Sequence, residues 1–86
     1  MKIEFDPAKN AANVAEHGLN FQDFNGFDTV PFEIIDDRSD YGEVRFRSFG
    51  RIDGIGHMIV YTVREERVRL ISFRRSHGKE MRRYEK

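Results

Sequence analysis

The fold is decided by residues 44–75, which read VRFRSFGRIDGIGHMIVYTVREERVRLISFRR. Val44 and Phe46 alternate with arginines, a pattern typical of a strand that buries one face and carries its arginines outward. Asp53-Gly54 is a hairpin signal, and residues 64–66 form the next turn. We therefore predict a meander of antiparallel strands, the first beginning at residue 43 and the next two covering residues 57–63 and 67–74.

The residues before this meander predict a helix that begins at Asp6-Pro7 and ends at Gly18. Aspartate caps a helix N-terminus, proline is tolerated at the first helical position, and glycine suits the left-handed conformation after the last turn. The small residues of this helix are expected to form a stripe that packs closely on the sheet. They are Ala8, Ala11, Ala12, Val14 and Ala15.

The remaining elements complete an α+β domain. They are a strand over residues 2–5, a short helix capped by Asn20, a strand over residues 32–35 and a helix over about residues 77–84 capped by Ser76. The acidic run over residues 36–40 is interpreted as a solvated loop. The order β-α-α-β-β-β-β-α predicts one domain over residues 1–86, with a small, largely antiparallel sheet flanked by helices.

The composition narrows the classes of function. With 86 residues the chain suffices for one small core, and the absence of cysteine excludes disulfides and a thiolate nucleophile. Its three histidines are not at zinc-ligand spacing, and no Gly-rich phosphate loop or G-x-S-x-G motif occurs. No stretch is apolar enough to span a bilayer. We therefore expect a cytoplasmic protein with no metal, no cofactor and no membrane partner.

The charges are unevenly distributed along a chain of zero net charge. Residues 1–43 hold three cations and ten acids, whereas residues 44–86 hold twelve cations and five acids. Eleven of the fifteen cations are arginines, whose planar fork binds phosphate. We therefore expect a polyanion-binding face on which Arg67, Arg69 and Arg75 lie together.

The last helix carries a possible catalytic group. His77, Glu80 and Tyr84 are three and seven residues apart, which places them on one helical face. RNA cleavage without a metal needs a base for the 2′-hydroxyl, cations for the developing phosphorane charge and an acid for the leaving oxygen. These side chains and the neighbouring arginines contain the chemical groups for such a reaction. The alternative is an ordinary surface helix.

Two ordered signatures resemble the BrnT-type toxins of bacterial type II toxin-antitoxin systems. The first consists of Phe5-Asp6-Pro7-Ala8-Lys9, Asn13, His17-Gly18-Leu19 and Phe21. The second consists of Gly50-Arg51, Val60-Tyr61-Thr62, Arg64, Arg69-Leu70-Ile71-Ser72, Arg74-Arg75, Glu80 and Tyr84. Together they cover almost the whole chain.

This resemblance implies a RelE-like ribonuclease fold and a toxin that cuts RNA to arrest growth. It also implies a cognate antitoxin with a ribbon-helix-helix DNA-binding domain, through which the complex would contact operator DNA. The catalytic candidates are Arg64, Arg74, Glu80, Tyr84 and His17, and the RNA-binding candidates are Lys9, Arg67, Arg69 and Arg75. Arg64 and Arg74 are expected to hold the scissile phosphate. Glu80 or His17 is expected to transfer a proton, and Tyr84 to orient or stack on a base.

Two other classes of function remain open. The chain could be a non-catalytic, antitoxin-binding subunit, derived from a decayed toxin, within an autorepressing complex. Direct DNA binding has less support, because the chain contains no helix-turn-helix or ribbon-helix-helix pattern. Gel shifts with and without the partner would separate these readings.

Overall fold

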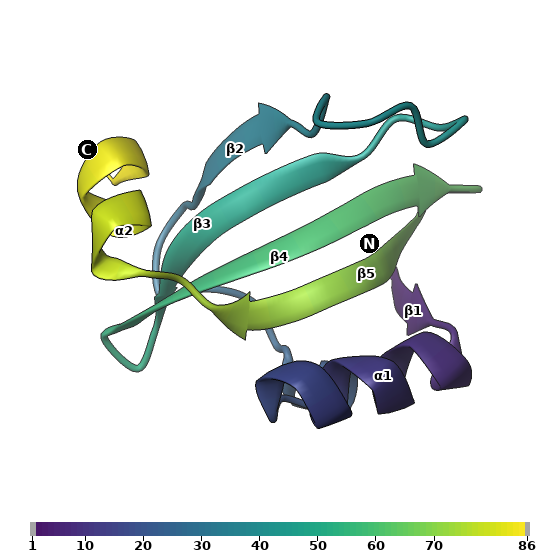
Figure 1. The fold of residues 1–86 in the computed structure, drawn as a ribbon, viewed down its shortest axis with the longest axis horizontal. Coiled ribbons are helices and arrows are strands. Elements are labelled where there is room, and N and C mark those ends of the chain that lie inside the picture. Colours follow the sequence, from purple (N-terminus) through teal and green to yellow (C-terminus); the bar gives the residue numbers. More distant parts are fainter. Residues whose placement is uncertain (1, 86) are drawn as a thin grey trace.

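A computed structural model describes residues 2–85 as a five-stranded sheet with helices beside it (Figure 1). The elements are β1 (Lys2–Phe5), α1 (Pro7–His17), the 3-10 helix η1 (Phe21–Asp23), β2 (Phe32–Ile35), β3 (Phe46–Ile52), β4 (Ile55–Arg64), β5 (Arg67–Arg75) and α2 (Gly78–Tyr84). The strand order is β1-β5-β4-β3-β2. Three neighbouring pairs are antiparallel, and β1 lies parallel to β5. The predicted α+β class is confirmed. The first strand of the meander begins at residue 46 rather than 43.

The ends of α1 follow the local sequence signals. The Asp6 carboxylate accepts a hydrogen bond from the Ala8 amide at 2.9 Å, and Gly18 adopts a left-handed φ of 73°. The Gly18 amide then donates to the Val14 carbonyl at 2.8 Å. Both predicted helix boundaries are confirmed because they depend on backbone groups within one turn of the capping residue.

The prediction of a small-residue stripe against the sheet is wrong. The alanines of α1 are exposed, and so is Val14, whereas Asn13 is buried. β1 pairs with β5 only as far as Leu70, and α1 lies beside the next part of β5. There the Asn13 side chain accepts a hydrogen bond from the Phe73 amide at 3.1 Å and donates to the Phe73 carbonyl at 2.8 Å. The helix therefore covers an edge of β5 at which backbone amide and carbonyl groups are unpaired. A polar side chain is needed there to form hydrogen bonds with these groups.

A bulge in β5 changes the direction of its side chains. Val60 pairs with Ser72 but Tyr61 pairs with Leu70, so Ile71 has no partner across the ladder. One extra residue shifts the alternation of a strand between its two faces. Arg74 therefore lies on the face of Arg67 and Arg69, whereas Arg75 lies on the opposite face. The expectation that Arg75 shares a face with Arg67 and Arg69 is wrong for this reason.

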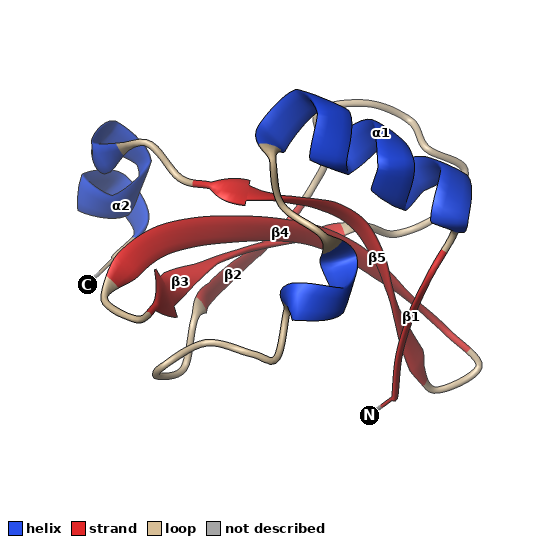
Figure 2. Cartoon of the chain, turned by 90° about the horizontal axis from the view of Figure 1, so that it is seen from below, coloured by secondary structure: helices blue, strands red, loops and turns tan. Residues whose placement is uncertain are grey.

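Each face of the sheet has its own apolar core. On the face of α1 and η1, Leu70 and Phe73 pack with Phe21, Phe24 and Ile59. Figure 2 shows α1 beside β5 and α2 at the far end of the sheet. No helix within residues 2–85 is long and apolar enough to cross a membrane.

On the other face, α2 contributes Met81 to a cluster with Phe49, Met58 and Val60. The N-cap of α2 is His77, not Ser76 as predicted. The Ser76 hydroxyl is instead buried without a hydrogen-bond partner. The Ser76 amide donates to the Gly56 carbonyl at 3.0 Å, so this residue continues the contact with β4 and the helix begins later.

Candidate functional site

One face of the sheet gathers most of the strand arginines, and we call it the arginine face. In an antiparallel ladder, residues that pair across strands point to the same side. The register places Arg47, Arg51, Arg64, Arg67, Arg69 and Arg74 on this side. Of the arginines within β3, β4 and β5, Arg75 alone lies on the opposite face. The spacing of these arginines in the sequence could not predict which of them share a face, because the bulge at Ile71 reverses the alternation of the strand.

Arg74 and Glu80 form an ion pair that joins β5 to α2. Two nitrogens of Arg74 donate to the two carboxylate oxygens at 2.8 and 2.9 Å, and the His77 amide donates to Glu80 at 2.9 Å. Hydrogen bonding from Arg74, the largest cause, lowers the pKa of Glu80 to about 2. Glu80 is therefore a carboxylate at neutral pH and a weak proton acceptor.

Arg74 keeps part of its fork unused. A guanidinium has five N–H donors. Nη1 donates to Glu80 and to the Arg75 carbonyl, and Nη2 donates once to Glu80. Among the described residues, nothing accepts from Nε or from the second N–H of Nη2. These two donors lie along one edge of the planar group, where a phosphate can bind bidentately.

His17 and Lys9 line a shallow hollow of about 190 Å³ next to Arg74's strand. The hollow is formed by α1 together with Ile71 and Ser72 of β5. Ser72 is on the arginine face, two residues before Arg74. The His17 side chain is 25% exposed, and its Nε2 lies 3.9 Å from the Glu16 carboxylate. The structure thus places His17 and Lys9 in a hollow beside Ile71 and Ser72 of β5, the strand that also carries Arg74.

Arg64 lies far from this group. Arg64 pairs with Arg67 at the turn between β4 and β5, whereas Arg74 pairs with Met58. Six residues of strand separate these positions, which is about 20 Å. Arg64 and Arg74 cannot hold the same phosphate, and the expected shared role is wrong. Arg64 instead donates to Glu43 at 2.9 Å.

Of the other predicted site residues, Arg67 and Arg69 lie near a carboxylate, whereas Tyr84 packs against aromatic rings. Arg67 and Arg69 lie 3.8 and 3.9 Å from the carboxylate of Glu4 in β1. The Tyr84 ring stacks on Phe49, with centroids 4.4 Å apart, and on Phe32, with centroids 5.4 Å apart. These contacts hold α2 against β3 and β2. Tyr84 therefore helps to position α2, the helix that carries Glu80.

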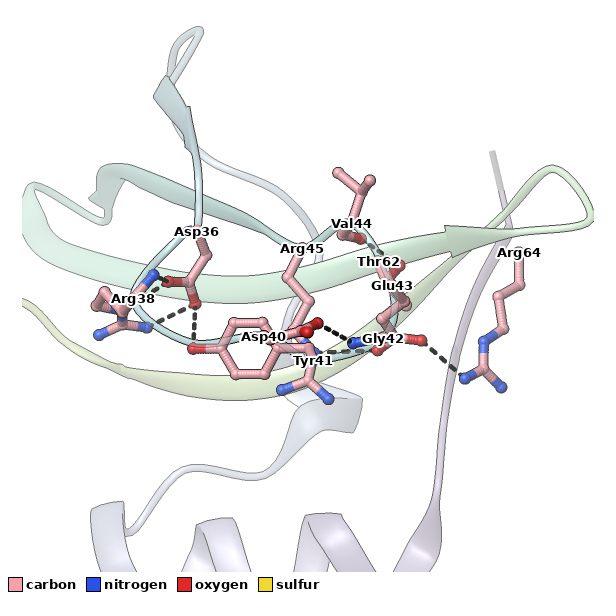
Figure 3. Close-up of polar contacts among 10 residues, drawn as sticks. All are labelled: Asp36, Arg38, Asp40, Tyr41, Gly42, Glu43, Val44, Arg45, Thr62 and Arg64. Carbon is pink, nitrogen blue, oxygen red and sulfur yellow. Dashed lines mark hydrogen bonds and ion pairs between the residues drawn. The ribbon is translucent and has the colours of Figure 1, made fainter.

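The segment from residue 36 to residue 45 is an ordered cover over one end of the arginine face (Figure 3). The Val44 carbonyl accepts a hydrogen bond from the Thr62 hydroxyl at 2.6 Å, and Glu43 binds both Arg45 and Arg64. At its start, Asp36 is only 4% exposed. The interpretation of residues 36–40 as a solvated loop is therefore wrong at Asp36.

Asp36 is buried because its hydrogen bonds are satisfied locally. Arg38 donates to its two oxygens at 2.7 and 2.8 Å, and the Tyr41 hydroxyl donates at 3.2 Å. Hydrogen bonding from Arg38 is the largest cause that lowers the pKa of Asp36 to about 2. No sequence signal marks this network, since an acid two residues before an arginine is common in solvated loops as well.

These contacts predict a loss of stability in acid. The pKa of Asp36 falls from 3.8 in its ordinary state to about 2 in the folded protein. Its stabilisation is therefore complete above the unfolded pKa and is lost as the pH falls from about 5 toward about 2. Asp36→Asn should lower the free energy of unfolding at pH 7 by about 1 to 2 kcal/mol and flatten this pH dependence.

Urea unfolding between pH 2 and pH 7 measures this effect. Asp37→Asn removes the same charge from an exposed neighbour and is the matched control. If the two variants had equal stability at every pH, Asp36 would not contribute in this way.

Together, the mixed sheet and its cationic face define a small α+β protein with an arginine face, a carboxylate paired with Arg74 and a histidine beside β5. The family model that describes the ribonuclease toxin BrnT of type II toxin-antitoxin systems matches residues 5–80. The chain belongs to this BrnT family, whose members are ribonuclease toxins of toxin-antitoxin systems. A comparison with curated proteins gives no match.

Proposed function

We propose that this protein is an endoribonuclease toxin that cleaves RNA without a metal, with two reacting groups at β5: Arg74 in the strand, and His17, which lines the hollow beside Ile71 and Ser72 of the same strand. The observation that carries the proposal is the free edge of Arg74. Glu80 fixes the guanidinium from one side, and two donors remain for the non-bridging oxygens of a phosphate. The α+β architecture is compatible with a RelE-like ribonuclease.

The reaction follows from these groups. The ribose 2′-oxygen attacks the adjacent phosphorus, the bond from phosphorus to the 5′-oxygen breaks, and the products are a 2′,3′-cyclic phosphate and a 5′-hydroxyl. Arg74 stabilises the charge that builds on the phosphate. His17 accepts the proton of the 2′-hydroxyl. The departing 5′-oxygen takes a proton from water, and His17 then releases its proton to the solvent.

Glu80 acts in this proposal as a positioning residue. Its depressed pKa argues against proton transfer, and its two hydrogen bonds to Arg74 orient the guanidinium. Tyr84 supports Glu80 by anchoring α2 through its stacking on Phe49.

RNA outside the scissile step is bound by the rest of the basic surface. Lys9 lines the same hollow as His17, and Arg69, Arg67 and Arg64 extend along the arginine face away from Arg74. In the free protein, Glu43 pairs with Arg64, and Glu4 lies near both Arg67 and Arg69, so these two carboxylates offset only part of the positive charge. An RNA strand would exchange these carboxylates for phosphates, so binding should weaken as salt increases. Arg75 lies on the opposite face and is not part of this proposed RNA-binding surface.

Membership in a toxin-antitoxin family supports a partner that neutralises the toxin. We propose an antitoxin with a ribbon-helix-helix domain, which would bring the complex to operator DNA in the cytoplasm. An acidic segment of that antitoxin could cover the same arginines that bind RNA.

Expression of this chain alone in bacteria tests the proposal. Growth should stop and total RNA should fragment, and both effects should disappear when the neighbouring gene is co-expressed. The purified chain should cleave RNA in the presence of EDTA. Normal growth and intact RNA, with soluble protein present, would favour a non-catalytic antitoxin-binding subunit instead. Cleavage that stops in EDTA would reject the metal-free mechanism alone.

A further inference from the structure

Arg47 lies in the central part of the arginine face. It lies in β3, pairs with Val60 of β4 and with Ile34 of β2, and is in the same row as Ser72. We propose that Arg47 binds a backbone phosphate of the RNA beside the one held by Arg74. This inference rests on the proposed ribonuclease function and adds a residue that neither family signature contains.

Arg47 differs from the other arginines of this face in having no carboxylate partner. Arg51 pairs with Glu85, Arg64 with Glu43, and Arg74 with Glu80, all within 3.0 Å, while Arg67 and Arg69 approach Glu4 within 4.0 Å. Among residues 2–85, the side chain of Arg47 makes neither a hydrogen bond nor an ion pair, and its Nε is buried without an acceptor. A buried N–H donor without an acceptor is unfavourable. The two Nη groups of the same guanidinium also have no acceptor among the described residues, and they are not buried. They leave the outer edge of the fork open to an external anion.

The guanidinium of Arg47 points toward the end of the face where Arg74 lies. Its central carbon is 5.8 Å from the centre of the Phe49 ring. Phe49 pairs with Met58, which pairs with Arg74, so these three residues form the next row across the sheet. Two strand spacings and a step of two residues separate the Cα atoms of Arg47 and Arg74 by about 12 Å. Met81 and Tyr84 of α2 pack on the Phe49 and Met58 part of this row. An RNA strand beside α2 can therefore contact Arg47 and Arg74 through neighbouring phosphates.

The chemistry favours phosphate over the carboxylates of a partner peptide. The chain supplies its own glutamates to the surrounding arginines and leaves Arg47 without one, although Glu33 is in the neighbouring strand. Glu33 points to the opposite face, where it accepts hydrogen bonds from Ser48 and Tyr61. An unpaired fork beside Arg74, which also has an unused edge, matches successive phosphates along an RNA backbone.

Fluorescence anisotropy with a short labelled 2′-O-methyl RNA, which has no free 2′-hydroxyl to attack, tests this inference. Arg47→Gln should weaken binding of the full chain by about tenfold and reduce the slope of log affinity against log salt by about 0.7. Arg82→Gln is the matched control, because Arg82 is exposed on α2 and its side chain has no hydrogen bond or ion pair among the described residues. It should leave the affinity within about twofold of wild type. Arg47→Lys keeps the charge without the fork and should fall between wild type and Arg47→Gln.

The melting temperature separates binding from structure. Removal of an unpaired, half-buried charge should leave the Tm of Arg47→Gln equal to or above that of wild type. A lower Tm with unchanged RNA affinity would overturn the inference and assign Arg47 to the fold. Unchanged RNA affinity with weaker antitoxin binding would overturn it in favour of a protein contact. If neither wild type nor Arg82→Gln bound the probe, the proposed ribonuclease function itself would fail.

Discussion

Arg74→Ala should lower the rate of RNA cleavage by at least about a hundredfold, because it removes the donors that stabilise charge on the reacting phosphate. The same variant should allow bacterial growth when the chain is expressed alone. Cleavage of a defined RNA by purified protein, followed on a gel over time, gives the rate. Lys79→Ala is the control, since Lys79 is an exposed cation on α2 close to the pair. A rate equal to wild type in Arg74→Ala would remove Arg74 from the mechanism.

The ion pair complicates this variant in one respect, because Arg74→Ala leaves the Glu80 carboxylate without its partner. The Glu80 side chain is 22% exposed, so an unpaired charge there costs stability. The double variant Arg74→Gln with Glu80→Gln keeps the size of both side chains and removes both charges. We expect it to have a Tm near that of wild type and still lack cleavage. Restored cleavage in the double variant would show that Arg74 acts only through the fold.

Asn13→Leu should lower the free energy of unfolding by about 3 kcal/mol, which corresponds to a fall in Tm of about 12 °C or more. Asn13 makes three hydrogen bonds, one to the Leu19 carbonyl and two to the backbone of Phe73. Leucine is a better helix former but would leave the Phe73 amide and carbonyl buried without partners. The cost of two such groups exceeds any gain in helix propensity.

Urea unfolding at neutral pH measures the loss in Asn13→Leu. Glu16→Leu places the same side chain on an exposed position of α1 and should change stability by less than about 1 kcal/mol. Equal effects of the two substitutions would mean that the contact with β5 contributes little.

Local signals in the sequence predicted the parts of the fold that depend on local backbone geometry. Asp53-Gly54 does form a two-residue turn, with positive φ at both residues and with Ile52 paired to Ile55. The cap at Asp6 and the helix end at Gly18 are confirmed for the same reason. Each of these features is determined within a few residues, so the sequence is sufficient to recognise it.

Long-range pairing determined the parts of the site that the sequence could not predict. The bulge at Ile71 depends on how β4 and β5 align. Because of this bulge, Arg74 lies on the arginine face and Arg75 does not. Arg64 and Arg74 are both in the family signature, yet the hairpin places them at opposite ends. Arg47 resembled an ordinary outward residue of an alternating strand. Only the positions of the surrounding glutamates distinguish it from the other arginines.

The contact between Asn13 and Phe73 also affects how the molecule meets other chains. The amide and carbonyl of an unpaired edge are the groups through which a sheet adds a strand from a second molecule, which is the first step of edge-to-edge aggregation. One carboxamide occupies both groups on Phe73, where β1 no longer covers β5. The outer strands β1 and β2 have four residues each, and where β3 extends past β2 the Asp28 amide donates to the Arg51 carbonyl. The sheet is thereby protected against templating further strands by one side chain and by the shortness of its outer strands.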